Sequence, residues 1–193
     1  MPRAVAVWML LAVAVLVPLA IAATSPLLQW RGPVYIAAGL AGVLALGLLL
    51  VQPLLIAGAM PVLTPRRCRA WHRWGGTALL VLVAMHIVGL WITSPPDVID
   101  VLLFRSPTPF SLWGAIAMWA VFGAALLATM RRRLAPRTWR LAHASLAAVT
   151  VASTVVHAML IEGAMGTASK AALCALALAA TLLVVGRTLR THL

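Results

Sequence analysis

The sequence predicts an all-α integral membrane protein, built as a bundle of six transmembrane helices. Of its 193 residues, 64% are hydrophobic and only 9% are charged, whereas an average soluble domain has roughly 25% charged residues. A chain of this composition has too little polar material to cover an apolar core. Six apolar runs are also long enough to cross a hydrocarbon layer, which takes about 20 helical residues.

The six runs predict helices over residues 4–23, 34–60, 72–93, 111–130, 139–161 and 170–187. Proline and glycine pairs or basic clusters separate them, and these residues favour turns. The connection after the third run has room for one short interfacial helix, from Val98 to Phe104. No soluble domain fits between the runs, so we expect a single membrane domain over residues 1–193.

The first run has an alternative interpretation as a cleaved signal peptide. Arg3 precedes it, and the small residues Ala20, Ala22 and Ala23 lie at its end, as they do before a cleavage site. The run is long for the core of a signal peptide. We therefore expect it to remain as the first transmembrane helix.

The basic residues predict the orientation of the bundle, because lysine and arginine are retained on the cytoplasmic side. Twelve of the fifteen lie in alternate segments, and the other segments hold only Arg31, Arg105 and Lys170. The three acids, Asp97, Asp100 and Glu162, lie with this smaller group. This distribution predicts that the N and C termini are both cytoplasmic.

The formal charge of +12 is thus explained by topology. The arginines form short clusters beside the membrane, where contact with anionic lipid headgroups is their usual role. No domain presents them to a nucleic acid, so we expect no nucleic-acid partner. The arginines outnumber lysine by fourteen to one, and this bias, with the alanine-rich helices, favours a GC-rich bacterial genome and hence an inner membrane.

Four of the five histidines show one repeated spacing. His72 and His86 lie fourteen residues apart in the third run, as do His143 and His157 in the fifth. Fourteen residues span about 21 Å of helix and fall about 40° short of four turns, so both members share a helix face. The two helices run in the same direction, so His72 and His143 share a depth near the cytoplasm and the other two share an outer depth. His192 is expected to be exposed and without a role.

In the simplest interpretation each histidine hydrogen-bonds to a neighbouring helix. The repeated spacing on parallel helices instead favours metal ligation, because ionisable groups inside a membrane are commonly functional. Two facing imidazoles suit a six-coordinate haem iron, so two depths predict two haems. A zinc or copper site would need three or four ligands at one depth. The sequence has no Cys-x-x-Cys-His motif, so we expect non-covalent haem b.

The neighbouring residues agree with this interpretation. Small residues that leave room beside the imidazoles follow or flank the histidines: Gly75, Gly76, Gly89, Ala147 and Ser153. Arg73 and Arg140 are candidates to bind the anionic haem propionates near the inner pair. Four tryptophans are expected to anchor the helices at the membrane interfaces rather than to relay electrons: Trp71, Trp74, Trp91 and Trp139.

The two His-x13-His helices, with RTWRLAH leading into the second, resemble the ferric reductase-like transmembrane domain. That family includes ferric-chelate reductases, NADPH oxidases and the haem-binding subunit of a bacterial periplasmic methionine-sulfoxide reductase. The resemblance implies that His72 and His143 hold an inner haem and His86 and His157 an outer haem. It also implies that electrons pass one at a time across the membrane.

Two features differ from well-known members of that family. No Gly-x-Gly-x-x-Gly nucleotide motif occurs and the chain ends at Leu193, so we expect electrons from a separate donor protein, flavin or quinol. His72 is present, whereas the methionine-sulfoxide reductase subunit tends to lack its counterpart. These features favour a stand-alone two-haem cytochrome that delivers electrons to an acceptor outside, and no residue is assigned a catalytic role.

Three alternatives stay open from the sequence. One is a haem subunit that serves a periplasmic reductase, and another is a quinone-linked cytochrome b of a different fold. The third is a non-redox transporter or structural protein. A transporter commonly has related halves or broken helices around a midplane site, and neither is evident. Whether catalysis takes place on this chain is left open.

Overall fold

The computed structural model describes residues 2–190, so His192 lies outside the described residues. Within that range the chain forms helices and no strand: α1 (Pro2–Ala23), α2 (Pro33–Ile56), α3 (Pro65–Thr93), α4 (Pro95–Leu102), α5 (Pro109–Thr129), α6 (Pro136–Leu160) and α7 (Thr167–Arg190), with short 3-10 turns η1 (Pro26–Leu28) and η2 (Met130–Arg133).

Six of these helices are long and apolar enough to cross a membrane. The all-α, six-span architecture predicted from the sequence is therefore confirmed, and the protein is a multi-pass membrane protein. Its lipid-facing surface consists of exposed apolar side chains such as Leu10, Val81, Leu126 and Leu183. The remaining helix, α4, is the short one expected after the third span, and it begins at Pro95 rather than at Val98.

Prolines explain where most helices begin. Proline stands at the first position of α2, α3, α4, α5 and α6, where its missing N–H has no helical partner to lose. α3 begins at Pro65, well before the expected residue 72, because Thr64 caps it by accepting a hydrogen bond from the Arg67 amide. α2 ends at Ile56 rather than at residue 60, one turn after Pro53.

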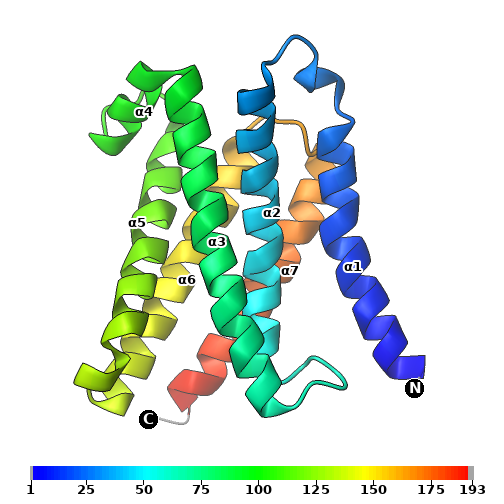
Figure 1. The fold of residues 1–193 in the computed structure, drawn as a ribbon, viewed down its shortest axis with the longest axis vertical. Helices are drawn as coiled ribbons and strands as arrows, with labels where there is room; N and C mark the ends of the chain where they lie inside the picture. The colour runs from blue at the N-terminus through cyan, green and yellow to red at the C-terminus, as the bar shows by residue number, and fades with distance from the viewer. Residues whose placement is uncertain (1, 191–193) are drawn as a thin grey trace.

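Five of the long helices form a closed ring of neighbours. α3 packs on α2, α2 on α7, α7 on α6, α6 on α5, and α5 returns to α3. α1 lies outside this ring against α2 and α7, as Figure 1 shows. α3 and α6, which carry the histidines, stand apart in the ring with α5 between them on one side.

Both ends of the described chain lie at the same end of the bundle (Figure 1). The basic turn η2 and the start of α3 lie there too, and we call this the arginine-rich end. α3 and α6 both begin at this end. They are therefore parallel, as the pairing of histidines at equal depth requires. Equivalent positions on α3 and α6 have the same depth.

The best-buried part of the core lies where α2 meets α7. Leu46 and Leu50 of α2 pack in one cluster with Leu173 and Ala177 of α7. Leu173 is only 1% exposed and Ala177 is 0% exposed. At the end of the bundle opposite the arginine-rich end, buried Lys170 donates a hydrogen bond of 2.5 Å to the Ile161 carbonyl, which ties the connection between α6 and α7 together. This packing holds α7 against α2 and α6 in the ring.

Gly89 allows the closest approach of α3 to α2. A Cβ placed there would lie 2.6 Å from the Ala38 Cβ, and a methyl group on a helix cannot swing away. We expect Gly89→Ala to force the helices apart and to cost about 1–3 kcal/mol of stability. Thermal unfolding of the purified protein in detergent measures this. Gly39→Ala, with no atom within 4 Å of its Cβ, is the control, and equal melting temperatures for both variants would contradict the prediction.

Candidate metal centre

His72 of α3 and His143 of α6 meet across the interior of the bundle, and we call them the first pair. Their ring centres are 6.3 Å apart and their planes are inclined at 77°. Two imidazoles that share one metal ion, with metal–nitrogen bonds of about 2.0 Å, have ring centres roughly 6 Å apart. The observed separation is therefore suited to two imidazoles that would share one metal ion.

His86 and His157, the second pair, lie farther from the arginine-rich end on the same two helices. They are near enough for a charge on one to act on the other. The Nδ1 of His86 donates to the Ala38 carbonyl at 2.8 Å, and that of His157 to the Phe110 carbonyl at 2.8 Å. A carbonyl only accepts, so each ring carries its proton on Nδ1 and leaves Nε2 unprotonated. This tautomer is the one in which Nε2 binds a metal.

A glycine on the neighbouring helix makes room for each ring of the second pair. Gly42 lies one turn after Ala38, and a Cβ there would be 3.0 Å from the His86 Nδ1. Gly114 lies one turn after Phe110, and its Cβ would be 2.8 Å from both Nδ1 and Cε1 of His157. The α2–α3 and α5–α6 helix pairs thus hold their histidines in the same way: a backbone carbonyl accepts the hydrogen bond from Nδ1, and a glycine one turn later leaves space for the ring.

The first pair is held differently. The Trp139 ring stacks on His143, with centres 5.3 Å apart and planes inclined at 12°. Trp139 is itself fixed by a hydrogen bond from its Nε1 to the Leu127 carbonyl at 3.1 Å, and the Arg131 guanidinium lies 5.2 Å from its ring centre. Trp139 is therefore a neighbour of the site, whereas the sequence placed it among the interfacial anchors. Among the described residues, the buried Nδ1 of His143 makes no side-chain hydrogen bond, and the group that acts on it is the backbone of Ala124 on α5.

The small residues near the histidines have separate roles. Gly76 faces open space one turn after His72, with no atom within 4 Å of a Cβ placed there, as room for a flat ligand requires. Gly75 and Gly89 instead face α2, where they meet Gln52 and Ala38. For these two glycines the expectation of space beside the imidazoles is wrong, because helix packing occupies that space.

The predicted propionate ligands lie at the arginine-rich end with exposed side chains. Arg73 follows His72 directly and is close enough for its charge to act on that ring. Arg140 lies one turn before His143 on α6. Neither is held in the packed core, so both are free to reach an anionic group at the membrane surface.

The described part of the chain holds no group of three or more histidine, cysteine or acidic side chains suited to a metal ion. Each pair presents two imidazoles, a donor set that suits a haem iron, whereas zinc and copper sites usually need three or four ligands in one place. The residues present therefore fit a haem group at each pair.

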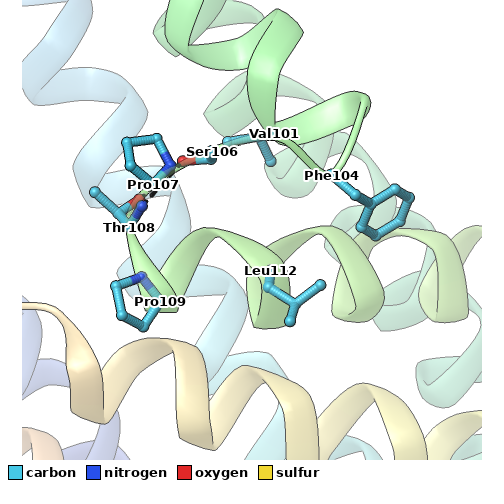
Figure 2. A pocket seen from close by; sticks show the side chains of 7 residues that line it. All are labelled: Val101, Phe104, Ser106, Pro107, Thr108, Pro109 and Leu112. Carbon is cyan, nitrogen blue, oxygen red and sulfur yellow. Dashed lines mark hydrogen bonds between the residues drawn. The ribbon is translucent and has the colours of Figure 1, made fainter.

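A shallow hollow of about 170 Å³ lies near the second pair, between α4 and α5. Figure 2 shows Phe104 from the end of α4 and Leu112 from α5 on its sides. Pro109 also lines it and directly precedes Phe110, whose carbonyl holds His157. The end of the bundle opposite the arginines therefore has an indented surface, lined in part by the residue that precedes the carbonyl partner of His157.

Sequence reasoning missed several residues around the four histidines: Gln52, Gly42, Phe110, Gly114 and Trp139. Gln52 carries a usable signal, since it is an amide within an otherwise apolar span. The two glycines carry none, because glycine is common in membrane helices for ordinary packing.

Comparison with known families identifies one match. The family described as ferric reductase like transmembrane component matches residues 38–154, a range that runs from Ala38, whose carbonyl accepts the His86 hydrogen bond, almost to His157. No curated protein and no solved structure matches the chain.

Proposed function

Because the chain belongs to the ferric reductase-like transmembrane component family, which suggests transmembrane electron transfer, we propose that it is a two-haem b-type cytochrome. The first pair holds one haem and the second pair the other. The single observation that carries this proposal is the meeting of His72 and His143 with ring centres 6.3 Å apart, on helices that repeat a His-x13-His spacing.

The chain's own residues supply ligation, orientation and a dry path. When bound, each haem supplies the one-electron chemistry of its iron. The carbonyls of Ala38 and Phe110 keep the second-pair rings in the ligand tautomer. Arg73 and Arg140 are the proposed partners of the propionates nearer the first pair, since guanidinium groups bind carboxylates in a bidentate way.

The direction of transfer follows from the proposed orientation. The arginine clusters support a cytoplasmic location for the arginine-rich end, and in this orientation the first pair accepts electrons there from a protein, flavin or quinol donor. The second pair passes them to an acceptor outside, or to a periplasmic partner, near the hollow beside Pro109. The composition supports a bacterial inner membrane as the location.

Spectroscopy of the full chain, purified from haem-replete cells, tests this proposal. We expect reduced b-type absorption bands, two haems per chain and two resolved midpoint potentials in a redox titration. The absence of reduced b-type bands would refute the proposal. A single haem would refute its two-site form, and the variants described in the Discussion would show which pair is idle.

A further inference from the structure

Gln52 is a buried amide in the middle of an apolar helix. It lies on α2 and is 9% exposed, between Val51 and Pro53 in a span whose other residues are almost all apolar. An amide in such surroundings is costly unless it is hydrogen-bonded. Its partners therefore indicate what it does.

All its partners belong to one turn of α3. In the orientation that satisfies the amide, its nitrogen donates to Nδ1 of His72 at 2.6 Å and to the His72 carbonyl at 3.1 Å. Its oxygen accepts from the Gly76 amide at 3.2 Å. The side chain thus holds both the ring and the backbone of His72.

The surface of α3 is shaped to admit this amide. A Cβ at Gly75 would lie 2.3 Å from the end of the Gln52 amide that faces Gly76, which is the oxygen in this orientation, so any larger residue there would push the amide away. Glycine at this position is thus a second, independent sign that the contact between Gln52 and His72 is built into the helix pair.

Gln52 is also unusual among the groups that support the four rings. Both second-pair rings bond to backbone carbonyls, which no substitution removes. The Nδ1 of His143 makes no hydrogen bond to a side chain in the part of the chain that the structure describes, and the group that acts on it is the backbone of Ala124. Within that part, His72 is the ring whose nitrogen meets a side-chain amide in addition to the backbone of Gln52, so the side-chain part of its support can be changed by mutation.

We propose that Gln52 is a positioning residue that sets the donor strength of His72 toward iron; this inference rests on the proposed two-haem function. A neutral His72 that accepts from the amide at Nδ1 carries its proton on Nε2. With iron held at Nε2, the ring proton would reside on Nδ1, and the amide would turn its oxygen to accept it, giving up its two bonds to the α3 backbone at His72 and Gly76. An amide serves both arrangements, because one end donates and the other accepts.

The second arrangement has an electronic consequence. A hydrogen bond from Nδ1–H to an acceptor makes the imidazole a stronger ligand, and a stronger ligand favours the oxidised iron. Removing the acceptor therefore raises the midpoint potential of that haem. Replacing it with a carboxylate, a stronger acceptor, lowers the potential.

The test is a spectroelectrochemical titration of the full chain with a measured haem-to-protein ratio. We expect Gln52→Leu to raise one of the two midpoints and Gln52→Glu to lower the same one, while the other midpoint stays in place. Gly75→Ala displaces the amide without removing it, so it is expected to shift that midpoint in the direction of Gln52→Leu. Gly39→Ala, at an exposed position on α2 with open space around it, is the matched control.

The outcomes separate this inference from the proposed function. Wild-type protein without haem refutes both. Wild-type protein with two haems refutes the role of Gln52 alone if the variants leave both midpoints unmoved, or if Gln52→Leu and Gln52→Glu shift a midpoint in the same direction. If Gln52→Glu does not fold, Gln52→Leu and Gly75→Ala still decide the matter by the sign of their shifts.

Discussion

His86→Ala is expected to remove one of the two low-spin haems and to leave the other with its original midpoint. The second pair loses one of its two proposed ligands, whereas the rings of the first pair, with centres 6.3 Å apart, are untouched. Loss of a ligand from a site of two is a large effect, comparable to the 10- to 100-fold or greater losses that accompany changes in the groups around metal ligands. Haem content per chain and the reduced spectrum measure it.

Double variants then test which histidines share an iron. Residues that act as one unit are not additive, so His86→Ala with His157→Ala should lose no more haem than either change alone. His72→Ala with His86→Ala removes one ligand from each pair and should abolish both low-spin haems. Met85→Ala, at a neighbouring position that is 50% exposed, is the control. Unchanged haem content in His86→Ala would show that this ring is not a ligand.

Gly114→Ala is expected to disable the second pair without touching a histidine. Its Cβ would lie 2.8 Å from Nδ1 and Cε1 of His157, so the ring must move and its 2.8 Å hydrogen bond to Phe110 is lost. Overpacking of this kind costs about 1–3 kcal/mol, which corresponds to a roughly 5- to 150-fold loss of affinity at that site. Titration of the protein with haem, followed by absorption, measures the loss.

The same helix offers the matched control. Gly123→Ala adds an identical methyl group to α5, but its nearest contact is an ordinary 3.7 Å to Leu146 Cδ1. Gly42→Ala is expected to fall between the two, because its Cβ would lie 3.0 Å from the His86 Nδ1. Equal haem affinities for Gly114→Ala and Gly123→Ala would show that close contact with His157 is unimportant.

The helix boundaries illustrate how far local patterns reach. Apolar runs predicted the six spans because the bilayer demands a minimum length of apolar helix, and this holds whatever the neighbours are. The apolar pattern did not predict the start of α3, because the first turns of this helix are basic. Only the Thr64 cap and Pro65 show that the helix begins there. The short α4 was expected from its apolar residues but begins at the prolines before them.

For the histidine pairs too, some features follow from the sequence and others only from the packing of the helices. Equal spacing and parallel direction followed from counting residues along two helices, because the helix repeat is constant. The direct meeting of His72 and His143 required the ring of helices, in which α3 and α6 are not sequence neighbours. The carbonyl partners of His86 and His157 lie 48 and 47 residues away along the chain, and no local pattern marks them.

The membrane class, the number of spans and the depths of the four histidines are properties of the residue order, because hydropathy and helical periodicity act within one segment. The identity of the supporting groups depends on the packing of segments against one another. Gly42, Gly114 and Gly75 matter through the atoms that a single methyl group would meet, and Gln52 matters through the one turn of α3 that it reaches. Such contacts exist only once α2 lies on α3 and α5 lies on α6.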